Sequence, residues 1–158
     1  MKVLEIMTTM AQTILPDATV QQASERMRDY NVGLLPVVEG GKIFGALTDR
    51  DIVVHVIAEG HNPHLTTVRE VMTRKPFVCY EDQPVTEAAR IMQQHHVRRL
   101  LVMNRLNKLS GIVTLTDMAL KIPNQKLSGR LLHNVADAAQ PESKKTALPT
   151  KAAFVPGR

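Results

Sequence analysis

Two copies of a short polar motif are the residues of this sequence whose types and spacing could do chemistry. GALTDRD spans residues 45–51, and GIVTLTD spans residues 111–117. Both copies have glycine, threonine and aspartate in the same spacing, GxxTxxD. An aspartate carboxylate only accepts hydrogen bonds, and it has the capacity for two hydroxyl donors. The paired hydroxyls of a ribose are one target that the motif could bind.

The threonine and the aspartate could also act without a ligand. Both residue types cap helices, because their side-chain oxygens accept hydrogen bonds from the free N–H groups of the first helical turn. In a single copy we would prefer this interpretation. Two copies in register, each with a glycine that would let a flat base approach the strand, favour a ligand site. The polar side chains of that site would be those of Thr48, Asp51, Thr114 and Asp117.

The motif is part of a longer internal repeat. Ten residues of the first half recur 65 positions later; Asp17 and Met27, for example, recur as Asp82 and Met92. From Gly45 onward the offset is 66, because the second copy has one more residue in a predicted loop, where insertions are tolerated. A match of this length indicates a duplication.

Each repeat predicts the same elements in the same order, which is strand, helix, strand, strand, helix. In the first repeat we expect a brief strand at 13–14, a helix from the capping pair Thr19 and Gln22 to about Tyr30, a hairpin of strands at 34–39 and 42–48, and a helix from near Asp49. In the second we expect a strand near Val78, a helix at about 84–95, strands at 99–104 and 109–115, and a helix from near Thr116. We therefore predict an α+β (α/β) fold of two repeats, each a small three-stranded sheet with two helices, packed as a pseudo-twofold pair.

Length and composition favour a compact protein without a membrane span. The 158 residues are 44% hydrophobic, which is enough to form a core. No apolar run approaches the roughly 20 residues that cross a bilayer, and the N-terminus lacks the layout of a secretory signal. A cytoplasmic location is therefore expected. Cys79 is the only cysteine, which excludes an internal disulfide and a cysteine zinc cluster.

Charge divides the chain into a neutral part and a basic tail. Residues 1–120 contain 13 Lys and Arg against 13 Asp and Glu, whereas residues 121–158 contain seven against two. A tail of this charge leaves open a second function, association with nucleic acid, whose affinity would depend on salt. The expected divisions are the first repeat with its linker at residues 1–64, the second repeat at 65–122, and a basic C-terminal tail at 123–158 that is largely disordered after 139.

Beyond the motif, the segments PDATVQQASERM, VGLLPVVEGGKIFG and HHVRRLLVM complete a family pattern. Together with the two motif copies they resemble the cystathionine-β-synthase (CBS) domain, and the tandem resembles a Bateman module over residues 1 to about 122. The resemblance implies a stand-alone regulatory protein that binds an adenosine-containing ligand, such as AMP, ADP, ATP, NAD or S-adenosylmethionine, in clefts between the repeats. It also implies that Asp51 and Asp117 bind the ribose, with Thr48 and Thr114 near the ribose and the first phosphate.

The resemblance also assigns residues to the adenine and phosphate ends of such a ligand. The implied adenine-side residues are Thr13, Ile14, Leu35, Pro36, Phe77, Val78, Leu100 and Leu101. Leu101 stands where the family often has the proline seen at Pro36, so the second adenine pocket is expected to differ in shape from the first. Phosphate oxygens need donors such as the planar guanidinium groups of Arg50, Arg98 and Arg99, which could equally be solvated surface charges.

No constellation of residues indicates catalysis, so we expect a protein that is not an enzyme and has no catalytic cofactor. The sequence lacks a GxxxxGK[ST] phosphate loop, a GxSxG elbow and an HExxH helix, and the neighbouring His95 and His96 lack the partners of a zinc site. By resemblance, the module would be a homodimer that signals ligand occupancy through its dimer interface or through an unidentified partner protein. A purely structural dimerisation module with empty sites is the third interpretation.

Overall fold

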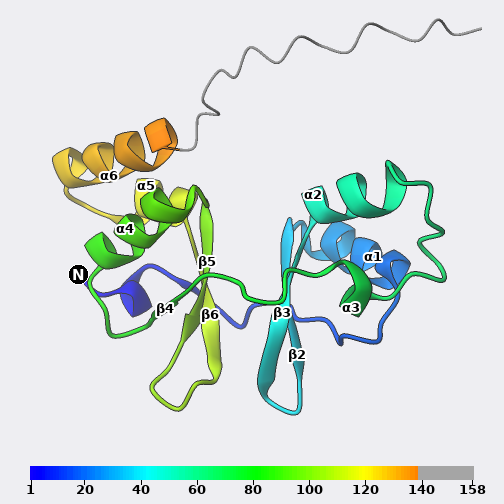
Figure 1. Ribbon diagram of the computed structural model, residues 1–158. Helices are drawn as coiled ribbons and strands as arrows, with labels where there is room; N and C mark the ends of the chain where they lie inside the picture. Colours follow the sequence, from blue (N-terminus) through cyan, green and yellow to red (C-terminus); the bar gives the residue numbers. More distant parts are fainter. Residues whose placement is uncertain (139–158) are drawn as a thin grey trace, which may run out of the picture.

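The computed structural model describes residues 1–138, in which two small sheets face each other and the helices lie on the outer sides (Figure 1). This is the α+β architecture of two packed repeats that the sequence predicts. The expected disorder after residue 139 falls outside the described residues. No helix among the described residues is long and apolar enough to span a bilayer.

Helix α1 (Val20–Tyr30) of the first repeat forms where the sequence predicts it. Thr19 Oγ1 accepts a hydrogen bond from the backbone N–H of Gln22 at 3.2 Å, and Gln22 Oε1 accepts one from the N–H of Thr19 at 2.9 Å. These two bonds are the predicted capping box. The helix ends at Asn31, which has the left-handed conformation with φ of 52°.

Each repeat contains the predicted hairpin. In the first repeat, β2 (Leu34–Glu39) and β3 (Lys42–Thr48) are joined by two glycines with φ angles of 56° and 76°, a conformation that glycine adopts without strain. In the second repeat, β5 (Arg99–Met103) and β6 (Leu109–Thr114) enclose the longer loop that carries the extra residue.

The third strand differs between the repeats. In the second repeat, β4 (Val78–Tyr80) forms a parallel ladder with β5, whereas in the first repeat Ile14 forms a single parallel bridge with Val37. The next hydrogen bond on either side of this bridge would need an N–H from Pro36 or from Pro16, and proline has none. The predicted three-stranded sheet of the first repeat is therefore a two-stranded ladder with one added bridge.

The remaining helices cover the outer faces of the two sheets (Figure 1). After β3 the chain forms α2 (Asp49–Ile52), which continues into a π-helical turn, η2 (Val53–Ile57). The linker between the repeats then leads to the short helix α3 (Val68–Val71). In the second repeat, α4 (Val85–His95) and α5 (Leu115–Lys121) correspond in sequence to α1 and α2.

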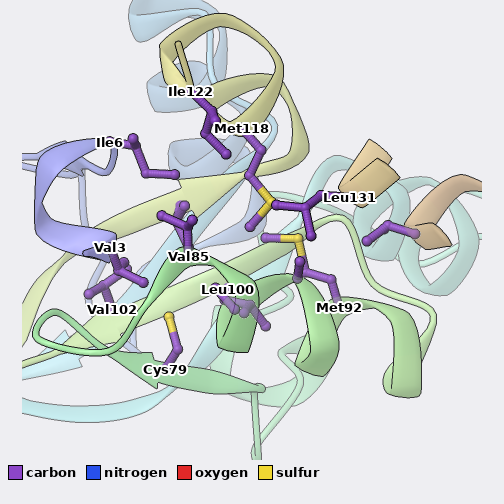
Figure 2. Packing of buried hydrophobic residues seen from close by; sticks show 14 residues of the cluster. Val3, Ile6, Cys79, Val85, Met92, Leu100, Val102, Met118, Ile122 and Leu131 are labelled. Carbon is purple, nitrogen blue, oxygen red and sulfur yellow. The ribbon is translucent and has the colours of Figure 1, made fainter. Parts of the chain in front are cut away.

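The first residues of each sequence repeat pack into the other repeat. The short helix η1 (Val3–Glu5) contributes Val3 to the second hydrophobic core, together with Ile6 (Figure 2), and β1 (Thr8–Thr9) pairs with β6 to complete a sheet of order β1-β6-β5-β4. Conversely, Val68 and Met72 lie in the first hydrophobic core. This reciprocal exchange ties the repeats together, so neither core is complete within its own stretch of sequence.

Residues predicted as the start of the tail form helix α6 (Gln125–Ala138), which packs on α4 and α5 (Figure 1). Leu131 and Val135 are buried in the second core, and Ser128 Oγ donates a hydrogen bond to Met118 O at 3.1 Å. Apolar residues four positions apart give this segment the period of a helix. The structured part of the chain therefore extends beyond the segment that the sequence assigns to the second repeat.

Candidate functional site

Both copies of the GxxTxxD motif lie where a hairpin strand passes into a helix. Thr48 ends β3 and Thr114 ends β6. Asp51 and Asp117 consequently occupy the third positions of α2 and α5. The structure places the predicted ribose-binding side chains at equivalent positions of the two repeats.

The glycines of the motif have a packing role. A Cβ atom on Gly45 would lie 2.5 Å from the carbonyl oxygen of Thr73, and one on Gly111 would collide in the same way with Thr8. Thr8 and Thr73 belong to the exchanged segments, and Thr73 exchanges backbone hydrogen bonds of 3.0 and 2.9 Å with Ala46. The glycines are therefore needed to make room for the segment that crosses from the other repeat. From the sequence we expect them to make room for the flat base of a ligand, and this packing role is not predicted there.

In both repeats the aspartate and the threonine cap the helix reciprocally. Thr48 Oγ1 accepts from the N–H of Asp51 at 3.1 Å, while Asp51 Oδ2 accepts from the N–H and the hydroxyl of Thr48 at 2.9 and 2.7 Å. Thr114 and Asp117 form the same bonds, with Asp117 Oδ2 accepting at 2.8 and 2.7 Å. Capping therefore uses Oδ2 and leaves Oδ1 for a second partner.

The second carboxylate oxygen has a different environment in each repeat. Asp117 Oδ1 forms an ion pair with Lys121 Nζ at 2.8 Å, and the same ammonium donates to the carbonyl oxygen of Ile6 at 2.8 Å. Asp51 Oδ1 has no hydrogen-bond or ion-pair partner among residues 1–138. Because no buried side-chain oxygen of the described residues lacks a partner, this atom is exposed. The first motif has an open acceptor, and the second has a closed one.

The predicted adenine-side residues form one cluster in each repeat, next to the third-strand contacts. Thr13 and Ile14 lie beside Leu35 and Pro36 in the first repeat, and Phe77 and Val78 lie beside Leu100 and Leu101 in the second. The leucine and isoleucine side chains are buried, so a ligand would meet mainly backbone groups there. Phe77 is 41% exposed, and its ring stacks on the His95 ring with centroids 3.9 Å apart. Gln12 and Tyr30 occupy the corresponding positions of the first repeat.

The predicted phosphate-binding arginines are exposed and have no ion-pair partner among residues 1–138; they are Arg50, Arg98 and Arg99. Arg99 begins β5 of the second repeat, but its Nη2 atom lies 3.4 Å from the position of a Cβ on Gly33 in the first repeat. Gly33 O accepts from the N–H of Asp49 at 3.2 Å. The guanidinium of Arg99 therefore crosses to the start of the helix that carries Asp51.

A cavity of about 370 Å³ that the sequence did not predict is lined by residues of both sequence repeats: His55, Glu59 and His61 of the first, and Thr66, Glu70 and Val71 of the second. Glu59 is 3.7 Å from His55 Nδ1 and 3.2 Å from His61 Nε2. The N–H and the hydroxyl of Thr67 both donate to Glu70 and lower the pKa of its carboxyl. No group of three or more His, Cys, Asp and Glu within residues 1–138 could hold a metal ion. The one feature of the sequence that could have indicated this polar cavity is the close spacing of His55, Glu59 and His61.

Comparison of the sequence with known proteins finds the same family twice along the chain. A model of the CBS domain matches residues 3–58 and again residues 68–124. The CBS domain-containing protein YhcV of Bacillus subtilis (strain 168) is 37% identical over 134 residues, which cover 85% of this chain and 94% of YhcV.

Solved structures share the fold. The CBS domain pair of protein MJ0100, in complex with 5′-methylthioadenosine and S-adenosyl-L-methionine, is 27% identical with a TM-score of 0.69, over 75% of this chain and 97% of that one. Hypoxic Response Protein I, with two coordinated zinc ions, is 31% identical with a TM-score of 0.71, over 78% of this chain and 100% of that one.

Proposed function

Because the chain belongs to the CBS domain family, which it matches over residues 3–58 and 68–124, we propose that it is a regulatory module that binds an adenosine-containing ligand between its repeats. Ligands of this class are AMP, ADP, ATP, NAD and S-adenosylmethionine. A bound ligand would favour one arrangement of the repeats and pass its occupancy to a partner protein or to a dimer interface.

The observation that carries this proposal is the open carboxylate oxygen of Asp51. Its Oδ2 atom accepts both bonds from Thr48, whereas its Oδ1 atom is exposed and has no partner among the described residues. A ribose hydroxyl that donates to this charged oxygen would form a bond worth roughly 1.5–3 kcal/mol. MJ0100, whose domain pair holds two adenosine compounds, supports this class of ligand.

The unpaired arginines support a ligand that carries phosphate. Arg99 extends from the second repeat to Gly33 of the first, and a guanidinium without a carboxylate partner suits phosphate oxygens. A nucleotide with its ribose on Asp51 and its phosphate on Arg99 would contact both repeats at once. Because the bound nucleotide would contact both repeats, its binding would favour one relative orientation of the two.

We also propose that the module acts by binding alone and not as an enzyme. Burial raises the pKa of the Cys79 thiol to about 12, so this thiol stays protonated and is a poor nucleophile. The alternative, nucleic-acid binding through the basic tail, gains no support from the described residues, because α6 packs on the second repeat. The expected cytoplasmic location remains a prediction.

We propose further that a second copy of the chain covers the outer helices of the first repeat, which would make the protein a homodimer. In the second repeat α6 packs on α4 and α5, but among the described residues α1 and α2 carry no such helix (Figure 1). Val53 and Ile57 on that face are each 58% exposed, and grouped exposed apolar side chains are typical of interaction surfaces. Sedimentation velocity should show a dimer that Val53→Asp with Ile57→Asp dissociates; a monomeric unmodified chain would contradict this.

A thermal-shift experiment tests the ligand class. At a free AMP concentration of about 100 times Kd, linkage stabilises the fold by roughly 2.7 kcal/mol, which corresponds to about 5–11 °C for a chain of this size. A shift below about 1 °C with AMP, ADP, ATP, NAD and S-adenosylmethionine at millimolar concentration would favour the structural dimerisation module instead.

A further inference from the structure

The two GxxTxxD motifs differ at the aspartate oxygen that does not cap the helix. In the second motif Asp117 Oδ1 pairs with Lys121, whereas in the first Asp51 Oδ1 has no partner among residues 1–138. We infer that each chain binds one phosphorylated adenine nucleotide, at the motif of the first repeat, and that Lys121 closes the motif of the second repeat from within. The inference rests on the proposed function and specifies which of its two sites is open. Lys121 would thereby act as a specificity-determining residue of the module.

The contacts of Lys121 saturate the second motif. Its ammonium lies between Asp117 Oδ1 and the carbonyl oxygen of Ile6, 2.8 Å from each. The other oxygen of Asp117 already accepts two bonds from Thr114, and Asp117 is only 8% exposed. A ribose hydroxyl would therefore have to displace the ammonium of Lys121, whose side chain is 43% exposed, from a carboxylate whose side chain is only 11% exposed.

The second anchor of Lys121 is fixed by the exchange of segments. Ile6 is 1% exposed and belongs to the second hydrophobic core (Figure 2). Its carbonyl oxygen therefore cannot move away without disturbing that core. Lys121 consequently joins the exchanged N-terminal segment to the helix that carries Asp117, and opening the second motif would also release this link.

The first repeat lacks this closure. At the position that corresponds to Lys121 stands His55. Its Nδ1 atom lies 3.7 Å from Glu59, and among residues 1–138 it forms no hydrogen bond or ion pair with Asp51. The corresponding turn is π-helical and not α-helical. Asp51 Oδ1 stays exposed and unpaired among residues 1–138. A ligand hydroxyl that donates to this oxygen would replace no hydrogen bond or ion pair among the described residues.

The arginines show the same asymmetry. Arg98 and Arg99 lie at the start of β5, and Arg99 reaches the first repeat at Gly33. The positions of the first repeat that correspond to these two arginines are Gly33 and Leu34, which carry no charge. At these two positions the second repeat carries cations, one of which reaches the first repeat, whereas the first repeat carries none. A phosphorylated nucleotide has both of its anchors only at the first motif.

Calorimetric titration of the full chain with AMP tests this inference. The unmodified protein is expected to bind one AMP per chain. Lys121→Met removes the ammonium and keeps most of the aliphatic stem, so it should open a second site and raise the stoichiometry to two. Adding Asp117→Asn to Lys121→Met should return it to one, because the second site then loses its charged acceptor.

A matched control and the melting temperature separate this effect from damage to the fold. His55→Ala changes the corresponding position of the first repeat and should leave the stoichiometry at one. Lys121→Met must melt cooperatively, and Lys121→Gln, which can still donate to Ile6 O, provides a second variant. Two AMP per unmodified chain, or one AMP in both Lys121 variants, would overturn this inference and leave the proposed function standing. No AMP bound by any of these proteins would overturn both.

Discussion

The two repeats share one sequence pattern, but the first has open groups where the second has internal partners. In the first repeat Asp51 keeps a free oxygen and the outer helices expose Val53 and Ile57. In the second repeat Lys121 holds Asp117, and α6 covers the outer helices. Both repeats thus keep the same order of helices and strands. Residues that differ between them leave polar and apolar groups unpartnered in the first repeat and supply partners for them in the second.

The third strand of the two sheets shows that a few substitutions are enough to make the repeats differ in structure. In the second repeat Leu101 N donates to Phe77 O at 3.3 Å, and Glu81 N donates to Met103 O at 3.0 Å. The corresponding residues of the first repeat are prolines 36 and 16, which have no N–H to donate. Two prolines therefore reduce a parallel ladder to one bridge, although the flanking segments match.

The largest expected effect concerns the helix that only the second repeat has. Leu131 of α6 is 9% exposed within the second core, so Leu131→Ala should reduce the free energy of unfolding by about 2–5 kcal/mol. Leu120 is 79% exposed, and Leu120→Ala should stay within about 0.5 kcal/mol of the unmodified protein. Urea unfolding measures both, and equal effects would show that α6 does not stabilise the second repeat.

Truncation sharpens the same comparison. Deletion of residues 140–158 is expected to leave the melting temperature and the AMP affinity unchanged. Deletion of residues 123–158 also removes Leu131 and Val135 from the second core and should cause unfolding or a large loss of stability. A nucleic-acid binding assay should therefore use the deletion of residues 140–158. With the longer deletion, a loss of binding could come either from the missing tail or from unfolding of the second repeat.

The next largest effect should separate the two aspartates. Asn caps a helix about as well as Asp but lacks the charge and one acceptor oxygen. Asp51→Asn should therefore keep its melting temperature and weaken AMP binding about 10- to 150-fold, from the loss of roughly 1.5–3 kcal/mol. Asp117→Asn should instead lower the melting temperature, because Lys121 loses its ionised partner. Calorimetry measures the affinity and differential scanning fluorimetry the melting temperature. The same changes in both variants, or the affinity loss in Asp117→Asn and the stability loss in Asp51→Asn, would contradict this prediction.

A smaller effect is expected for the arginine that crosses between the repeats. Arg99→Gln should weaken AMP binding by about two- to fivefold, since exposed charge pairs contribute little more than this in water. It should leave adenosine affinity unchanged, because adenosine has no phosphate. Arg90, which already pairs with Glu87, provides the matched control in Arg90→Gln. Equal losses for AMP and adenosine would place Arg99 away from the phosphate.

The smallest effect concerns acid stability at the start of α3, the short helix that follows the linker. The N–H and hydroxyl of Thr67 lower the folded-state pKa of Glu70, so Glu70 contributes stability above its unfolded pKa of about 4.3. This contribution is lost as the pH falls through the folded-state pKa. Glu70→Gln does not titrate, so its melting temperature should fall less steeply than that of the unmodified protein between about pH 5 and pH 3. Parallel melting curves over this range would contradict the assignment.

Most of the local structure could be predicted from the sequence, because it depends on residues close together in the chain. The Thr19 and Gln22 capping box, the two-glycine hairpin turn and the GxxTxxD junctions all formed at the predicted positions. Each is decided by side chains within a few residues of the backbone groups that they satisfy. The repeat itself, and with it the family, was visible at the same level.

Only the tertiary structure decided which residues far apart in the sequence come into contact. Lys121 pairs with Asp117 four residues earlier in the same helix, but its second bond, to the carbonyl oxygen of Ile6, depends on the N-terminal segment crossing into the second core. Arg99 likewise reaches Gly33 only because the repeats face each other. Hydrophobic burial selects such long-range packing without regard to sequence distance. The sequence therefore determined the two motifs and the local pair of Asp117 with Lys121, and the packing added the long-range contacts at Ile6 and Gly33.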